Sequence, residues 1–170
     1  MFSPKQLNPF CTLVLILTAF CLSNCSENSE YGDTSDYEKT GATDLIEPTI
    51  LSVSPTDNST NIAFSTAVAV TFSETMSTST ITTNTDNTTC YGSFRLSSDN
   101  FTTCIKMSAA PSASNSDKTF SVTPDDNLSR GTTYKLQITT SVTDTSSNSL
   151  ASAYTTTNGF TTYSSGTIKG

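Results

Sequence analysis

Any catalytic chemistry in this chain has to work without histidine, because the 170 residues contain none. Histidine is the commonest general base and metal ligand, so acid–base catalysis would fall to Asp and Glu. The only adjacent acids, Asp125 and Asp126, follow Pro124 in a predicted turn, where neighbouring side chains seldom face each other. A Ser–Lys pair stays open, although nothing singles out a partner among the six Lys and Arg after residue 47. We therefore predict no enzyme, no cofactor and no small-molecule substrate.

Side-chain oxygens are concentrated in Asp144–Asn148, where they could bind calcium together with Glu74 or Asp57. Calcium takes about six to eight oxygen ligands, and this segment supplies a single carboxylate. A turn held by the Asp144 side chain accounts for the same residues more simply. We therefore predict no metal site.

The N-terminus carries an apolar run over residues 10–22, preceded by one charged residue, Lys5. As a helix this run would measure about 20 Å, short of the roughly 30 Å core of a bilayer. A basic start, a short apolar centre and small polar residues are typical of a secretory signal. A buried core helix is the alternative, but the polar tract that follows fits it poorly. We predict that residues 1–24 are an export signal.

The signal ends in Leu22-Ser23-Asn24-Cys25, which resembles the lipobox of bacterial lipoproteins. The resemblance implies that Cys25 receives lipid, palmitate included, and becomes the new N-terminus. Asn24 departs from the pattern, which prefers Gly, Ala or Ser there. Cys21 is a rival, but Phe20 would place a bulky ring at its cleavage position. Several acyl chains on Cys25 would make a stable membrane anchor.

Cys90 and Cys104 are the two cysteines left in the exported part of the chain. They flank a predicted turn between Phe94 and Phe101, and an antiparallel hairpin could bring them opposite each other. Outside the cytoplasm such a pair is usually oxidised. We predict a disulfide worth on the order of 3 kcal/mol, with two free thiols as the alternative.

Acidic residues are concentrated in residues 25–47, which follow the signal. Between Ser26 and Glu47 there are seven acidic residues and one lysine, whereas the chain from Pro48 on has eight acids and six bases. The segment lacks apolar periodicity, so we predict a disordered tether that holds the next domain roughly 25 Å from the membrane. An acidic binding tail is the alternative. The net charge of -7 argues against nucleic acid as a partner.

Residues 48–164 consist of short segments in which apolar and polar residues alternate, separated by turns. This alternation, with Ser and Thr making up 62 of the 170 residues, favours strands and turns. Residues 111–117 are predicted to be a loop and 165–170 a C-terminal tail. About seven strands predict an all-β, two-sheet antiparallel sandwich. The predicted strands are 49–54, 67–72, 94–96, 101–107, 120–122, 134–139 and 160–163, with a short edge segment at 61–64.

The core of this sandwich should be formed by the apolar residues of the alternating segments. Tyr134 ends a segment, Leu128–Tyr134, that has the pattern of a tyrosine corner, in which the hydroxyl bonds to the backbone a few residues upstream. An ordinary inward tyrosine is the alternative. The predicted core comprises Ile50, Val53, Val68, Val70, Phe72, Phe94, Leu96, Ile105, Phe120, Val122, Leu128, Tyr134, Leu136, Ile138, Val142, Leu150 and Phe160.

Several short motifs recur in a fixed order along residues 48–163. They are Pro48-Thr49-Ile50, Ser54-Pro55, Asn61-Ile62-Ala63, 70–76, Ser79-Thr80-Ile81, 120–124, 128–134, Val142-Thr143-Asp144, Asn148, Leu150 and 159–162. Their order resembles that of the bacterial Ig-like domain of S-layer proteins. The resemblance implies an Ig-like β-sandwich used as a spacer or adhesive module outside the cell, without catalysis. Ser147 stands where the family often has Gly, and residues 86–104 are not part of the family pattern.

Together these features predict an exported bacterial lipoprotein of the cell envelope, on the outer membrane and with its domain displayed at the surface. Its expected partners are the membrane, through Cys25, and a protein ligand bound by the domain. We expect adhesion or structural spacing as its function. The alternatives are a structural component that binds other envelope proteins and an accessory carbohydrate-binding module.

Overall fold

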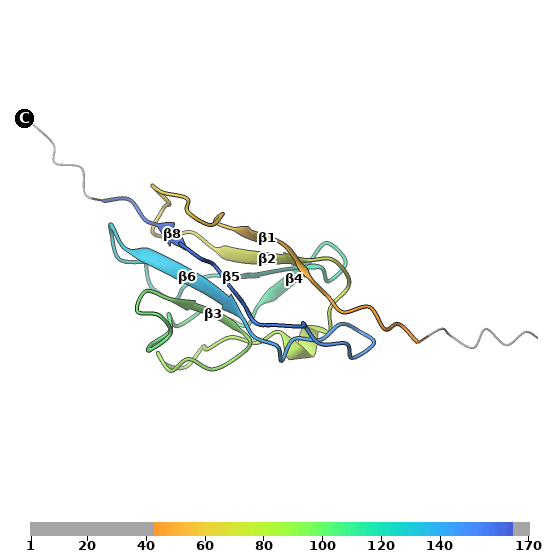
Figure 1. The fold of residues 1–170 in the computed structure, drawn as a ribbon. Coiled ribbons are helices and arrows are strands. Elements are labelled where there is room, and N and C mark those ends of the chain that lie inside the picture. Colours follow the sequence, from red (N-terminus) through yellow and green to blue (C-terminus); the bar gives the residue numbers. More distant parts are fainter. Residues whose placement is uncertain (1–42, 165–170) are drawn as a thin grey trace, which may run out of the picture. The chain divides into compact units, whose positions relative to one another are not determined.

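The computed structural model describes residues 43–164, which form an all-β sandwich of two antiparallel sheets (Figure 1). This confirms the predicted fold class. The predicted signal 1–24, Cys25, most of the tether and the tail 165–170 lie outside the described residues. Within them, no helix is long and apolar enough to cross a bilayer. The strands are β1 (Ile50–Ser54), β2 (Val68–Phe72), β3 (Phe94–Ser97), β4 (Ser112–Ser114), β5 (Thr119–Val122), β6 (Thr133–Ile138), β7 (Tyr154–Thr155) and β8 (Phe160–Thr161), with a 3-10 turn, η3 (Thr78–Thr80), after β2.

One sheet has the strand order β1-β2-β5-β4, and the other has the order β3-β6-β7, with β8 also paired to β6. The central strands β2, β5 and β6 alternate between buried and half-exposed positions, so each turns one face inward. Phe72 and Phe120 meet edge to face in this core, with ring centroids 6.1 Å apart. The two sheets are therefore held together by the apolar side of each alternating segment.

The predicted core is largely confirmed. Ile50, Val53 and Ile105 are half-buried and pack against the core cluster, while the other predicted residues belong to it. The cluster also contains three residues that lie outside the strands of the structure and that the predicted core omits. These additional buried residues are Met76, Ile81 and Met107.

Three strand predictions differ from the structure. Residues 101–107 form no strand, since Met107 makes only an isolated bridge to Pro124. The predicted loop 111–117 contains β4, which pairs with β5 as a hairpin. The predicted last strand, 160–163, is shortened to β8, and β7, which the predicted strands omit, pairs with β6 along the same side. In each case a tertiary pairing decides the structure of a segment that has no strong alternation of its own.

The tyrosine corner is present. The backbone amide of Ser129 donates a hydrogen bond to the Tyr134 hydroxyl at 2.9 Å, while the ring is 2% exposed and stacks on Phe160. The amide of Gly131 donates to the carbonyl of Tyr163, which joins the same corner to the end of the described chain. The corner thus fixes the crossing between the sheets at one end of the sandwich.

Candidate functional site

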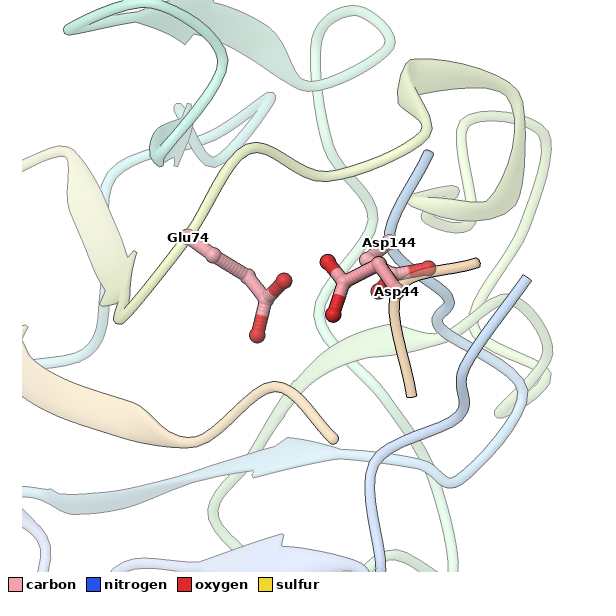
Figure 2. A group of neighbouring side chains, drawn as sticks. All are labelled: Asp44, Glu74 and Asp144. Carbon is pink, nitrogen blue, oxygen red and sulfur yellow. The ribbon is translucent and has the colours of Figure 1, made fainter. Parts of the chain in front are cut away.

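Three carboxylates converge where the described chain enters the sandwich (Figure 2). They belong to Asp44, Glu74 and Asp144, and one oxygen of each lies within 4.8 Å of the others. Glu74 lies two residues after the end of β2, Asp144 lies in the loop between β6 and β7, and Asp44 precedes β1. The cluster therefore joins three segments that are far apart in the sequence.

Asp144 is positioned by a turn that its own side chain closes. Its Oδ1 accepts hydrogen bonds from the amides of Ser146 and Asn148 at 2.8 Å, and its Oδ2 accepts one from Asn148 Nδ2 at 2.8 Å. Ser147 has a φ of 73°, a left-handed conformation that favours glycine. This is the side-chain-stabilised turn expected from the sequence, and the left-handed Ser147 lies at the position where the resemblance noted above leads one to expect glycine.

Asp44 is held against this turn by its backbone. Its carbonyl accepts a hydrogen bond from Asn148 Nδ2 at 3.0 Å, and its Oδ1 accepts one from the amide of Ile46. The sequence places Asp44 at the end of the acidic tether, where nothing distinguishes it from the acids before it. Only the contact with Asn148, 104 residues away, brings Asp44 into the cluster.

Asp57, the other carboxylate considered as a calcium ligand, lies elsewhere. It accepts hydrogen bonds from the amides of Thr157, Asn158 and Gly159, and so joins the turn after β1 to the segment between β7 and β8. Its role in the structure is to hold the backbone of that segment. The prediction that Asp57 might accompany Asp144 is therefore wrong, whereas Glu74 does lie beside it.

The three carboxylates are not electrostatically equivalent. Partial burial, together with the negative charges of Asp144 and Asp44, raises the pKa of the Glu74 carboxyl above its usual 4.5. Burial acts in the same direction on Asp144, but the hydrogen bonds from Asn148 and Ser146 outweigh it and lower the pKa of that carboxyl. Asp144 therefore keeps its charge, and Glu74 carries most of the repulsion within the cluster.

We expect Glu74→Gln to raise the stability of the domain at pH 7 by up to about 1 kcal/mol, the size usual for charge interactions near a surface. Because the folded-state pKa of Glu74 is raised, the folded protein binds this proton more tightly than the unfolded chain does. The penalty is therefore absent well below pH 4.5 and grows as the pH rises through the folded-state pKa. Thermal melts of both proteins between pH 3 and 8 should diverge in that direction.

Glu47→Gln is the matched control, since Glu47 is an exposed glutamate three residues after Asp44 that lies outside the carboxylate cluster. It should leave the melting temperature close to that of the unaltered protein over the whole pH range. A Glu74→Gln variant less stable than the unaltered protein at pH 7 would contradict the repulsion described above.

Asp125, one of the two adjacent acids, pairs with a lysine. Asp125 accepts a hydrogen bond from Lys106 Nζ at 2.7 Å, in an ion pair whose side chains are 41% and 38% exposed. This contact raises the pKa of Lys106 and so keeps the amine protonated. A charged, exposed lysine is a poor general base, so the ion pair supports the surface turn and supplies no nucleophile.

The disulfide predicted between Cys90 and Cys104 is present, with its Cα atoms 4.9 Å apart. The two cysteines do not lie on paired strands. Instead, the amide of Cys104 donates to the carbonyl of Thr88, and that of Ile105 donates to the carbonyl of Leu96, outside the β3–β6 pair. The disulfide therefore closes a loop that contains β3 itself, and Ile105, just after this loop, bonds to β3 on the side away from β6.

Comparison with known proteins gives one family and several similar structures. The family model described as a bacterial Ig-like domain matches residues 44–162. No curated protein matches the chain. Among solved structures, domains 1–6 of the surface layer protein SbsC are 24% identical, with a TM-score of 0.47, and the match covers 70% of this chain and 14% of that one. The N-terminal part of the bacterial S-layer protein SbsC is also 24% identical, with a TM-score of 0.47, covering 69% of this chain and 24% of that one.

Proposed function

Because the chain belongs to the family of bacterial Ig-like domains over residues 44–162, we propose that it is a lipoprotein of the bacterial cell envelope. A lipid on Cys25 anchors it to the outer membrane, and the Ig-like domain binds a protein or spaces one from the membrane. The domain performs no catalysis. Its proposed role is to present a folded, rigid surface at the end of the tether.

The observation that supports this proposal is the position of the two ends of the described chain (Figure 1). Asp44 contacts Asn148, beyond the last residue of β6, whereas Tyr163 pairs with Ile62 and Gly131, before the first residue of β6. The chain therefore enters at one end of the sandwich and leaves at the other. A lipid on the N-terminal side would therefore be attached, through the tether, at the carboxylate end of the domain and not at its tyrosine-corner end.

The alternative of a carbohydrate-binding module has less support among the described residues. Sugar sites generally use an exposed aromatic ring as a platform, and the chain has no tryptophan. Tyr134 is buried, and the hydroxyl of Tyr91 is tied to Asp86. Tyr163, 50% exposed, is the one tyrosine among the strongly exposed residues of 43–164. One exposed tyrosine ring therefore supports a sugar-binding site less well than the family supports a protein-binding or spacing role.

Display at the cell surface is tested with a specific protease site inserted between residues 26 and 42. Protease added to intact cells should release the domain into the medium, because the cut separates it from Cys25. A soluble periplasmic protein carrying the same site is the control and should stay uncut. Release only after the outer membrane has been opened would contradict surface display and assign the domain to a partner inside the envelope. Cross-linking in intact cells would then identify that partner.

A further inference from the structure

A groove lies at the seam between the two sheets, where the edge strands β1 and β7 come together. It is lined by residues 48–50 and 150–154, and we call it the entry groove because the described chain enters the domain beside it (Figure 1). Its volume is about 220 Å³, below the range of about 300–1,000 Å³ that is usual for small-molecule sites. A groove of this size accommodates one or two apolar side chains, as the pockets for anchor residues in protein interfaces do.

Large apolar side chains are exposed beside the entry groove. Leu45, Ile46 and Leu51 are 79%, 70% and 66% exposed, and each lies within three residues of a residue that lines the groove. Tyr163, near the tyrosine corner, is the fourth large hydrophobic residue that is strongly exposed within 43–164. Scattered apolar residues on a surface are ordinary, whereas apolar residues that gather at one place mark sites that another molecule covers.

The carboxylate cluster of Asp44, Glu74 and Asp144 borders this groove. Thr49, in one wall, exchanges two hydrogen bonds of 2.9 Å with Ser73, and these place Glu74 next to that wall. The turn that Asp144 closes leads directly into the other wall. The apolar groove therefore has carboxylates along its border, contributed both by the domain and by the segment that enters it.

The charge at this border is negative. Burial and the charges of Asp144 and Asp44 raise the pKa of the Glu74 carboxyl, and Lys118 offsets only part of this effect. Glu47, which is exposed, adds a fourth carboxylate directly before the groove. Three other bases lie near the tyrosine corner instead, namely Lys106, Arg130 and Lys135. A partner that covers the entry groove therefore has to bring positive charge with it.

We propose that the entry groove binds a basic segment of a partner protein. One or two apolar side chains of that segment enter the groove, and Lys or Arg residues on either side of them meet the carboxylates. An apolar centre with a polar rim is the usual anatomy of a protein interface, and opposite charges on the two rims select the partner. The inference rests on the proposed function, since it names the kind of protein that the domain binds.

The irregular pairing of β1 favours recognition through side chains. The register of β1 against β2 shifts between Ile50 and Ser52, at the exposed Leu51. Irregularities of this kind in an edge strand hinder the addition of a further strand. The basic segment therefore docks by its side chains, and reversal of its charge should remove most of the binding.

The test uses the chain from Ser26 onward, without lipid, and two synthetic peptides. The buried core, both sheets and the disulfide lie within residues 43–164, so this chain keeps every described contact. One peptide has two leucines flanked by lysines, and in the other peptide glutamates replace the lysines. Amide NMR shifts at millimolar peptide should map the lysine peptide to residues 44–51 and 148–154, with about tenfold tighter binding than the glutamate peptide. No shifts in these residues, or equal shifts with both peptides, would overturn the proposal.

Leu51→Ser and Tyr163→Ser form a matched pair of variants. Each removes a large exposed hydrophobic side chain, one beside the entry groove and the other near the tyrosine corner. Leu51→Ser should weaken binding of the lysine peptide about fivefold, because apolar surface is no longer covered, and Tyr163→Ser should leave it unchanged. Melting temperatures establish that both variants are folded. Equal effects of the two variants would overturn the assignment of the site.

Other occupants of the entry groove give different results in the same assay. If the same residues shift when the protein alone is concentrated, a second copy covers the groove and the proposal is wrong. If vesicles of phosphatidylcholine bind through Leu51, the groove is a membrane contact and the proposal is also wrong. Because the chain in this assay carries no lipid, failure here leaves the Cys25 anchor untouched, and failure of the anchor leaves peptide binding measurable.

Discussion

Replacement of both Cys90 and Cys104 by serine will lower the free energy of unfolding by about 3 kcal/mol, the amount expected when a disulfide closes a loop of about 15 residues. The sequence separation of the two cysteines is 14, and the loop between them contains β3. Without the disulfide the unfolded chain regains the freedom of that loop, while the folded state still has to order it. Urea unfolding of the chain from Ser26, followed by circular dichroism because there is no tryptophan, measures the loss.

A reducing agent provides the control for this variant. It should destabilise the unaltered protein by a similar amount and leave the double variant unchanged. The loop also has its own hydrogen bonds, since Asp99 accepts from Thr103 and Ser97 and has its pKa lowered to about 2. A double variant as stable as the unaltered protein would mean that these hydrogen bonds alone order the loop.

Gly159→Ala will destabilise the domain by more than about 3 kcal/mol, because a left-handed conformation and a steric overlap act together. The φ of Gly159 is +74°, and a Cβ there would overlap the backbone carbonyl oxygen of Tyr134 on β6. Its amide also donates a hydrogen bond to Asp57, so the backbone cannot shift away without losing that contact. The expected result is a large fall in melting temperature with β8 detached from β6, visible as loss of amide-exchange protection at Thr162, whose amide donates to the carbonyl of Thr132 next to β6.

Gly131→Ala is the control for Gly159→Ala, since Gly131 has a φ of +57° but has room for a Cβ, with Ser164 Cβ nearest at 3.5 Å. It therefore carries the conformational penalty alone, about 1 kcal/mol. If the two alanine variants lose the same stability, close packing of Gly159 on β6 contributes nothing and our account of this segment fails.

The sequence predicts the parts of the fold in which each strand has one buried face. Val68, Val70 and Phe72 alternate with small residues, and the structure places all three in the core. The tyrosine corner is also predictable, because it depends on local spacing between Ser129 and Tyr134. Such features depend on residues that are close in the sequence, so they can be predicted without knowing how the rest of the chain folds.

Other features depend on contacts between distant segments and leave no local pattern. Met76 is a single apolar residue in polar surroundings, Met107 ends a segment that forms no strand, and β4 contains only serine and alanine. Within the candidate site, Glu74 and Asp144 could be named from the sequence as oxygen ligands. Asp44 joins them through its contact with Asn148. The sequence gives no sign of this, because Asp44 is one of several acids in the tether.

The central claim is that Cys25 carries the lipid that fixes this domain to the bacterial envelope. Radiolabelled palmitate should enter the intact protein, and the protein should partition into detergent. After Cys25→Ser the label should disappear and the domain should move to the aqueous phase, whereas Cys21→Ser should change neither. If Cys25→Ser leaves labelling and partitioning as they were, the anchor is not at Cys25 and the proposed function is wrong.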